Sequence, residues 1–434
     1  MFSISTGSTN ANSNNFAQGL FTLNITNKTN IELKKESSTT ANNVSLQVIE
    51  LIDRDAPIVN LIYPINEFNF SSYTIEQFNF SVTDYSTIIN CSLYGNWTTG
   101  WHINQTIQNP AKSTVLNFSS INTESDGFYI WNVKCVDQYD NIGFNSTNFT
   151  FSTYLPPDSP VLYNISQTSN EGTGNITLFW NSSNHTIQYK IYYGSNMSSF
   201  SLLNTTSQLN YTDTGFSGNK RRFYYIEAVN PIGQNSSQDY FGAHVYTLGH
   251  NGNTRNWIGF PTNASYLTNA NETLNEIRNA TAFTMWNATT QNRVTCNLFT
   301  CPSYPSCTDT TCNFDLSPGA GYELNINSSV PSLINWSLVG IVYSPVTINL
   351  IKNSTDFGKN WIAMYANTSL INANNLINNI TNADAVTNWD NQLQKSKGYI
   401  YVPGWGIYIG TNFNTEIEKG YEVSVTADTD WMQA

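Results

Sequence analysis

Short runs in which apolar and polar residues alternate recur along most of this chain. Between residues 54 and 154 they follow one another at about ten-residue spacing, separated by turn-forming residues. The runs are 58–64, 76–83, 88–94, 101–107, 114–118, 128–136 and 144–152. A period of two is typical of strands that are buried on one face, and seven short strands at this spacing predict a β-sandwich.

The same alternation continues on either side of this segment. Residues 1–53 hold three strand-like runs, 17–25, 31–35 and 44–52, which predict part of a sandwich whose other half precedes Met1 or comes from another segment. The next boundary has three prolines in six residues, at 155–160. Beyond it, apolar residues alternate on two strands of a second predicted sandwich, which ends near residue 247: Ile176, Leu178 and Trp180, then Ile187, Tyr189, Ile191 and Tyr193.

The last third of the chain contains the same segment twice. The triplets Asn-Trp-Ile at Asn256 and Asn360 open the two copies, and matching residues then recur 103 positions apart. These pairs are Leu267 with Leu370, Ala270 with Ala373, Ile277 with Ile380, Ala280 with Ala383 and Trp286 with Trp389. The register predicts a tandem duplication of a domain of roughly ninety residues, at 248–345 and 346–434.

Each copy places apolar residues at helical spacing after its first strand. Leu274 and Ile277 in the first copy correspond to Leu376, Ile377 and Ile380 in the second. The Thr/Asn before each helix can cap it, and a strand is expected to follow the helix. The predicted fold class is therefore mainly β: tandem β-sandwiches followed by two repeated small α+β domains.

Composition shows how these domains keep a polar surface. Only 11% of residues are charged, against about a quarter in a typical soluble protein, whereas aromatic residues reach 14%. Asn, Ser and Thr supply the polarity instead, and such an aromatic content indicates folded rather than disordered domains. The net charge of −12 and the lack of a basic patch beyond the cluster 220–222 argue against a nucleic-acid partner.

N-glycosylation sequons form the most informative polar pattern. The chain has 28 Asn-x-Ser/Thr sequons, whereas random placement of these residues would give about half that number. The excess predicts an N-glycosylated surface protein, because a drift toward asparagine alone would raise the number of sequons only in proportion. Representative candidates are Asn24, Asn69, Asn96, Asn104, Asn145, Asn181, Asn204, Asn235, Asn263, Asn287, Asn327 and Asn367.

The six cysteines favour an oxidising location. Two of them lie in the first predicted sandwich and four in a short loop of the first C-terminal copy: Cys91 and Cys135, then Cys296, Cys301, Cys307 and Cys312. Zinc-binding cysteines usually come in pairs two to four residues apart, which this loop lacks, so disulfides are favoured over a four-thiolate zinc site. The nested pairing (296–312 with 301–307) and the sequential pairing (296–301 with 307–312) both remain open.

The start of the chain does not have the pattern of an export signal. Met1 and the residues after it lead into Asn and Ser rather than into an apolar segment, and no apolar run is long enough to span a membrane. We therefore expect the chain to be a fragment of a larger exported protein. Its signal and its membrane anchor would then lie in parts of the parent outside this chain.

Residues 54–154 resemble the Ig-like domains of prokaryotic, especially archaeal, cell-surface proteins. The matching stretches are 56–64, 82–84, 89–93 and 127–137. The resemblance implies that Cys91 pairs with Cys135, because these residues lie on the two strands that carry cysteines in that family, and that Trp131 packs in the core. Residues 1–53 resemble the closing half of a sandwich module of archaeal surface proteins.

Residues 155–247 are similar to fibronectin type III domains in the order of their strands. The stretch 224–233 matches the penultimate strand and turn of that family. One departure concerns the tyrosine that the family has at a corner of the sandwich. Alternation puts Arg222 at this position, so the corner is either absent or shifted to Phe223 or Tyr224.

The two C-terminal copies resemble a small α+β repeat found at the ends of bacterial and archaeal exported proteins. The first copy keeps the motif Pro-Gly-x-Gly-Tyr at 318–322, whereas the second has Glu418-Lys-Gly-Tyr in its place. The resemblance implies no enzymatic activity. Ig-like and fibronectin-like domains are likewise spacers or binding modules far more often than enzymes.

Residues capable of catalysis or metal binding form no strong pattern. Three acidic pairs, Asp53/Asp55, Asp137/Asp140 and Asp428/Asp430, suit Ca²⁺ at domain junctions, although solvated turn aspartates are the simpler interpretation. The histidines His102, His185, His244 and His250 lie beside no Ser or Cys nucleophile motif. We expect no enzyme and, Ca²⁺ aside, neither a metal site nor another cofactor.

The best candidate for a ligand contact is an aromatic stretch of the second copy. It contains Tyr399, Tyr401, Trp405 and Tyr408, with Pro and Gly around Trp405 to hold a turn. Aromatic faces stack on sugar rings and anchor interfaces. In the alternative interpretation, two core strands form a hairpin here, with either Tyr399 and Tyr401 or Ile400 and Val402 facing inward.

These features predict the extracellular structural or adhesive arm of a larger cell-surface protein. The expected partner is another surface protein or a glycan. Two alternatives are a carbohydrate-binding accessory region of an exported enzyme and a self-assembling subunit of a surface layer or filament. A membrane contact is expected only through parts of the parent outside this chain.

Overall fold

The computed structural model describes residues 53–433 with the exception of 99, 252, 301–311, 330–332 and 354–357. Before residue 53 it describes only the backbone of four strands: β1 (Ser3–Gly7), β2 (Phe21–Asn27), β3 (Asn30–Lys35) and β4 (Asn43–Gln47). β1 pairs antiparallel with β4, and β2 with β3. The three runs predicted here overlap β2, β3 and β4, whereas β1 was not predicted.

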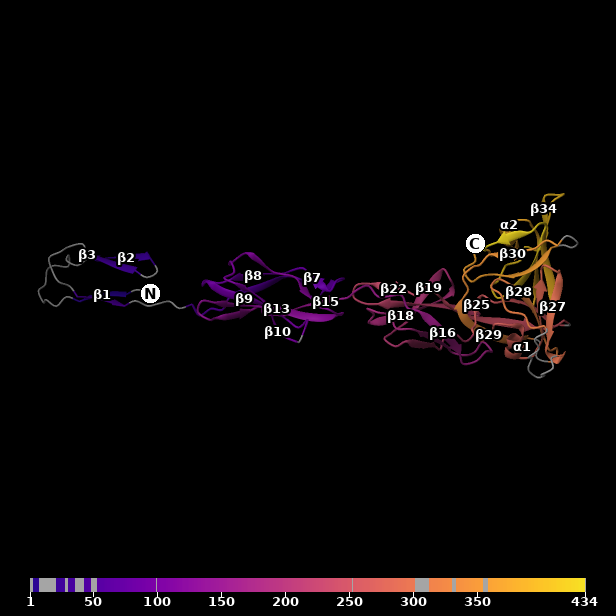
Figure 1. The fold of residues 1–434 in the computed structure, drawn as a ribbon, viewed down its shortest axis with the longest axis horizontal. Helices are drawn as coiled ribbons and strands as arrows, with labels where there is room; N and C mark the ends of the chain where they lie inside the picture. The colour runs from indigo at the N-terminus through magenta and orange to yellow at the C-terminus, as the bar shows by residue number, and fades with distance from the viewer. Residues whose placement is uncertain are drawn as a thin grey trace. The chain divides into compact units, whose positions relative to one another are not determined.

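The chain forms two compact units, and strands dominate both of them (Figure 1). Unit 1 consists of residues 1–68, 75–122 and 129–151, and unit 2 of residues 69–74, 123–128 and 152–434. The mainly β fold class is thus confirmed. No helix among the described residues is long and apolar enough to cross a membrane.

The region predicted as an Ig-like domain folds as two packed sheets. One sheet has the order β10-β9-β13-β15-β6, with β14 beside β13, and the other has the order β11-β8-β5. Their bounds are β5 (Ile58–Tyr63), β6 (Phe68–Phe70), β8 (Phe78–Thr83), β9 (Ile88–Gly95), β10 (His102–Gln108), β11 (Val115–Phe118), β13 (Gly127–Asp137), β14 (Ile142–Phe144) and β15 (Phe149–Thr153); two short strands, β7 (Thr74–Ile75) and β12 (Ile121–Asn122), pair with each other.

Aromatic side chains fill the space between these two sheets. Trp131 is fully buried, and its ring lies 5.0 Å from that of Phe78 on the opposite sheet. Phe80 stacks on Phe118 at the same distance. Each of the seven predicted strands overlaps an observed one because alternation places these residues on the inner face.

The fibronectin-like region has a three-stranded sheet, β16-β17-β20, packed against a longer one. The bounds are β16 (Leu162–Gln167), β17 (Ile176–Trp180), β18 (Gln188–Asn196), β19 (Ser199–Thr206), β20 (Asn210–Asp213), β21 (Arg221–Val229), β22 (Gln234–Ser236) and β23 (Phe241–Gly249). Leu178, Trp180 and Ile191 lie in its core, whereas Ile187 precedes β18 and is exposed. Of the two candidates for the corner, Phe223 has no hydroxyl, whereas the buried hydroxyl of Tyr224 donates to the side chain of Asp213 at 2.7 Å.

The longer sheet continues beyond the fibronectin-like region. Its order is β19-β18-β21-β23-β29-β25, so β29 (Leu333–Val342) and β25 (Thr262–Asn263) of the first C-terminal copy extend it. β23 pairs with β29 at every residue from Phe241 to Gly249. The boundary predicted between residues 247 and 248 falls inside β23.

The two C-terminal copies have the same order of elements. The first has β24 (Arg255–Gly259), α1 (Ala270–Glu276), β26 (Ala280–Asn287), β27 (Asn292–Asn297), the short 3₁₀ helix η1 (Leu298–Thr300) and β28 (Gly321–Ile326). The second has β31 (Lys359–Ala363), α2 (Ala373–Asn379), β32 (Ala383–Asp390), β33 (Lys395–Val402), β34 (Ile407–Gly410) and β35 (Gly420–Val425), and its ends pair as β30 (Ile348–Leu350) with β36 (Thr429–Trp431). The sheet orders correspond: β24-β28-β26-β27 and β31-β35-β32-β33-β34.

Both helices begin and end in the same way. Asn269 and Asn372 are the N-caps, and the side-chain oxygen of each accepts a hydrogen bond from the backbone N–H three residues later. After each helix an asparagine turns the chain into the next strand, at Asn279 with φ 64° and Asn382 with φ 65°. Asparagine tolerates this left-handed conformation better than most residues. The predicted caps are thus confirmed.

Candidate functional site

The aromatic stretch of the second copy forms the β33–β34 hairpin. Tyr401 pairs with Tyr408 and Val402 with Ile407, and four residues connect the two strands. Within this turn the backbone N–H groups of Trp405 and Gly406 donate to the carbonyl oxygen of Val402 at 3.1 and 2.9 Å. Gly406 has φ 64°, which glycine adopts easily. The turn leaves the Trp405 side chain 73% exposed.

Three tyrosines lie on one face of this hairpin. The rings of Tyr399 and Tyr408 stack in parallel at 5.1 Å, and Tyr401 lies 5.0 Å from Tyr408. The Tyr408 hydroxyl donates to Asn378 Oδ1 at 2.6 Å and so fixes the hairpin to α2. Tyr399 and Tyr401 pack against the core of the second copy. The alternative of inward-facing strands thus describes these two residues, whereas Trp405 and Tyr408 reach the surface.

The opposite face and the outer edge of the hairpin are apolar. Ile400 pairs with Ile409, and these two side chains and Ile407 are each between 42% and 47% exposed. β34 is the last strand of its sheet, and no charged residue occurs from 398 to 414. An uncharged apolar edge strand with an exposed tryptophan at its turn is suited to contact with another molecule.

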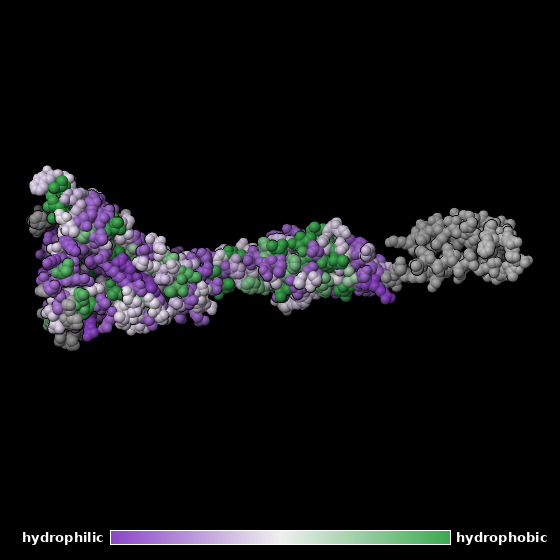
Figure 2. Space-filling view, turned by 180° about the vertical axis from the view of Figure 1, so that it is seen from behind, coloured by the Kyte–Doolittle hydropathy of each residue, from purple (hydrophilic) through white to green (hydrophobic). Residues whose placement is uncertain are grey.

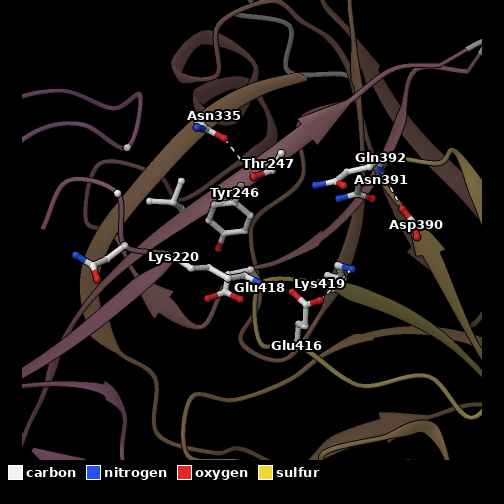
Figure 3. Close-up of a pocket in the computed structure, with 14 residues that line it drawn as sticks. Lys220, Tyr246, Thr247, Asn335, Asp390, Asn391, Gln392, Glu416, Glu418 and Lys419 are labelled. Atoms are coloured by element: carbon white, nitrogen blue, oxygen red, sulfur yellow. Dashed lines mark hydrogen bonds and ion pairs between the residues drawn. The ribbon is translucent and has the colours of Figure 1, made fainter. Parts of the chain in front are cut away.

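A second site lies between the fibronectin-like region and the second copy, within unit 2. It is a cavity of about 490 Å³ with polar walls (Figure 3). Figure 3 shows Lys220, which directly precedes β21, and Tyr246 of β23 near Glu416, Glu418 and Lys419 from the loop before β35. Lys220 and Lys419 both form ion pairs with Glu416.

Glu418 connects the two parts of unit 2 beside this cavity. Its side chain is only 4% exposed and accepts hydrogen bonds from Arg221 Nη2 at 2.7 Å and His244 Nδ1 at 3.1 Å. Burial opposes ionisation, but the hydrogen bond from His244 and the charges of Arg221 and Lys220 outweigh it and lower the pKa of Glu418. Burial lowers the pKa of His244, although Glu418 opposes this effect. These groups join the parts rather than present a free reactive group.

Sequence reasoning had noted Glu418 only as a departure from the repeat motif. The sequence argued against a nucleic-acid partner for the basic cluster at 220–222. In the structure each residue of this cluster pairs with a carboxylate: Lys220 with Glu416, Arg221 with Glu418 and Arg222 with Asp213. No local signal could have found the pairs of Lys220 and Arg221, because they join residues almost two hundred positions apart.

One member of each of two predicted acidic pairs, Asp53/Asp55 and Asp137/Asp140, lies in a different acidic group in the structure. Oxygen atoms of Asp53, Asp84 and Asp137 lie within 4.8 Å of one another in unit 1, whereas Asp55 and Asp140 lie outside this group. Asp53 Oδ2 accepts from Ser86 Oγ, and Asp137 Oδ1 accepts from two backbone N–H groups. Burial and the charge of Asp53 raise the pKa of Asp84, although a backbone hydrogen bond opposes this. Carboxylate oxygens are the donors that Ca²⁺ prefers.

The structure describes four of the six cysteines, and all four are in disulfides. Cys91 and Cys135 are bonded, which confirms the predicted pairing. They face each other on the neighbouring strands β9 and β13 of one sheet, whereas the disulfide of antibody domains joins the two sheets. Cys296 bonds to Cys312, which excludes the sequential pairing and a four-thiolate zinc site; Cys301 and Cys307 lie outside the described residues.

Most of the candidate glycosylation sites lie at the surface. Of the twelve asparagines, the side chain of Asn24 lies outside the described residues. Seven others are exposed, namely Asn69, Asn104, Asn181, Asn204, Asn235, Asn263 and Asn367, and four are half-buried, namely Asn96, Asn145, Asn287 and Asn327. A further sequon asparagine, Asn271 in α1, is buried with 8% exposure. Surface position is a condition for carrying a sugar.

The similarity of this chain to known proteins is limited to solved structures. No family model matches the sequence, and no curated protein matches it. The chain is similar to the structure of FN3tt mut, with 28% identity over 18% of this chain and 88% of that one and a TM-score of 0.17.

Two other similar structures come from multidomain proteins. The fibronectin(III)-like modules of Clostridium thermocellum CbhA are 11% identical over 42% of this chain and 92% of that one, with a TM-score of 0.21. A tetra-tandem repeat from the extending region of a large adhesion protein is 10% identical over 87% and 99%, with a TM-score of 0.27. The multidomain β architecture described above is concluded from the strand pairing of this chain and not from these similarities.

Proposed function

We propose that this chain is the extracellular structural and adhesive arm of a larger cell-surface protein. The observation that carries the structural part is the sheet that passes from β19 to β25 through β23 and β29. Because β23 pairs with β29 along its whole length, one continuous sheet joins the fibronectin-like region to the first copy. Such a connection suits a protein that holds a contact surface away from its anchor.

We also propose that the two C-terminal copies arose by tandem duplication and pack as an internal pair. Equivalent residues make equivalent contacts in both directions, as expected for two-fold packing. Trp286 Nε1 donates to the carbonyl oxygen of Lys359 at 2.7 Å, and its counterpart Trp389 Nε1 donates to that of Arg255 at 2.8 Å.

The glutamines of the two copies repeat this exchange. Gln291 bonds both the N–H and the carbonyl oxygen of Lys359, and Gln394 bonds the same two groups of Arg255. Trp257 and Trp361 lie 5.8 Å apart between these contacts. Reciprocal contacts of this kind support a duplication rather than two unrelated domains.

The extracellular location is supported by two further observations. The two disulfides are typical of oxidising compartments. The exposed sequon asparagines would carry sugars that supply the solubility that charged residues do not. The proposal therefore includes both export of the chain and its N-glycosylation.

The adhesive contact is proposed to lie at the β33–β34 hairpin, with another surface protein or a glycan as partner. The test is binding of the full chain, coupled to beads, to envelopes of its source cells. Trp405→Ala is expected to weaken binding about tenfold or more, since an aromatic anchor that becomes buried in the complex contributes about 2 kcal/mol or more. Tyr85→Ala, which removes a 91% exposed aromatic residue elsewhere, is the control. Equal binding by both variants would contradict this location.

A second candidate function is carbohydrate binding for a larger exported enzyme. The stacked pair Tyr399 and Tyr408 beside the exposed Trp405 favours it, because sugar rings stack on such faces. Micromolar binding of a polysaccharide that is lost in Trp405→Ala would support this function. Indifference of the chain to every glycan tested would contradict it.

A further inference from the structure

The larger sheet of unit 1 has one face turned away from the core. In β9 and β13 the side chains of Leu93, Val133 and Cys135 are fully buried between the two sheets. Side chains alternate along a strand, so the residues next to these point to the opposite, outer face. Tyr94 is such a residue, and it pairs with Asn132 across the ladder.

This outer face carries exposed apolar side chains. The rings of Trp101 and Phe144 lie 5.8 and 5.4 Å from the ring of Tyr94. Ile103 pairs with Tyr94 on the β10 side, and Ile142 precedes Phe144 by two residues on β14. These neighbours of Tyr94 are between 43% and 52% exposed. Apolar side chains gather at several places on the molecular surface, as Figure 2 shows for one side. Contiguous patches of this kind mark contact surfaces.

A sequon asparagine stands on the same outer face. Asn90 pairs with Val136, and Val136 pairs with Ile142 on the next strand. Directly paired residues project to the same side of a sheet, so Asn90 lies beside the apolar side chains. It is half-buried and is followed by Cys91 and Ser92, which complete the sequon.

A second sequon asparagine reaches this face from the loop after β14. The side-chain oxygen of Asn148 accepts a hydrogen bond from Asn132 Nδ2 at 2.7 Å, and Asn132 is the residue paired with Tyr94. Asn148 is exposed, and no described residue accepts a hydrogen bond from its amide nitrogen. The atom to which a sugar is attached is therefore accessible beside Tyr94.

We propose that N-linked glycans on Asn90 and Asn148 lie across this outer face and cover its apolar residues. The inference rests on the proposed glycosylation of the chain. A sugar ring has an apolar face that packs on aromatic side chains, while its hydroxyl groups keep the covered surface polar. The occupant is the chain's own carbohydrate, because two bulky groups attached within the patch would keep a protein partner away from it.

The test uses the full chain purified from its source cells. Removal of the glycans is expected to raise the binding of an apolar fluorescent dye several-fold. A variant with Asn90→Gln and Asn148→Gln localises this effect and is expected to reproduce most of it. A matched variant with Asn204→Gln and Asn235→Gln, whose exposed sequons lie on β19 and β22, is expected to bind the dye like the parent.

Glycopeptide mass spectrometry of the same samples separates the possible failures. Sugars on both asparagines with unchanged dye binding in the Asn90/Asn148 variant would overturn the inference. Sugars on other sequons but not on these two would also overturn it, while leaving the proposed glycosylated arm intact. Unmodified asparagines throughout the chain would overturn both.

Discussion

At the scale of single residues, one position distinguishes the two C-terminal copies. Gly319 in the first copy has φ 74°, and an added Cβ there would meet the Tyr365 hydroxyl at 2.8 Å. Counted back from the matching tyrosines, the second copy has Glu418 at this place, where it bonds Arg221 and His244. The same position therefore packs closely in one copy and forms a buried ion pair in the other.

The stability of unit 2 is expected to fall in acid because of this network. The folded pKa of His244 lies below its ordinary value, so the unfolded chain takes up a proton near pH 6.5 that the folded chain does not. Stability therefore decreases as the pH falls below about 6.5. The lowered pKa of Glu418 adds stability above about pH 4.3, which is lost as the pH falls through the folded value. Urea unfolding between about pH 7.5 and 3 measures both effects.

The variant His244→Gln provides the control for this prediction. It removes the group that titrates near neutral pH and keeps a side chain able to donate to Glu418. Its stability is expected to change little between about pH 7.5 and 5.5. A decrease equal to that of the parent over this range would contradict the role given to His244.

The three carboxylates of unit 1 make a second prediction at this scale. Asp84→Asn removes one charge from the group with Asp53 and Asp137 and is expected to stabilise unit 1 by about 0.5–1 kcal/mol in the presence of a chelator. Added Ca²⁺ is expected to raise the melting temperature of the parent and not that of the variant. An equal rise in the melting temperature of the parent and of the variant on addition of Ca²⁺ would contradict a Ca²⁺ site at these three carboxylates.

At the scale of elements, alternation and helical spacing predicted strands and helices where side chains are buried on one face. The three-residue strands β30 and β36 were missed because they are too short to show a period. The pairing of β23 with β29 was missed for another reason: alternation tells which face is buried and not which strand lies alongside. For the hairpin, sequence predicted its turn but left open which tyrosines face the core.

The two helix caps allow a matched prediction at this scale. Asn269→Ala and Asn372→Ala each remove one side-chain hydrogen bond to a backbone N–H at the start of a seven-residue helix. Each is expected to cost about 1 kcal/mol in the free energy of unfolding of unit 2. Chemical denaturation of the two variants measures the cost. A loss in one copy only would contradict the equivalence of the two helices.

The disulfide between β9 and β13 is the other element-scale prediction. Replacing Cys91 and Cys135 by alanine together opens a loop with a sequence separation of 44 and is expected to cost unit 1 about 2–4 kcal/mol. Urea unfolding of the double variant, compared with the disulfide-bonded parent, measures this loss. Unchanged stability would mean that strand pairing alone closes the loop.

At the scale of the whole molecule, the account joins a shared sheet, a paired duplication and a polar, uncharged surface into one surface arm. Sequence predicted the order of the segments from their motifs and spacing. It could not predict that the sheet crosses the boundary near residue 247, because the contact is made between strands whose partners lie about ninety residues apart. The charge pairs of Glu416 and Glu418 were hidden for the same reason.

The most direct test of the surface arm is glycopeptide mass spectrometry on protein released by protease from intact source cells. The account predicts sugars on exposed sequons such as Asn69, Asn181 and Asn204, within a parent heavier than 48.6 kDa, and none on the buried Asn271. Unmodified asparagines in a protein that the protease cannot reach on intact cells would contradict it.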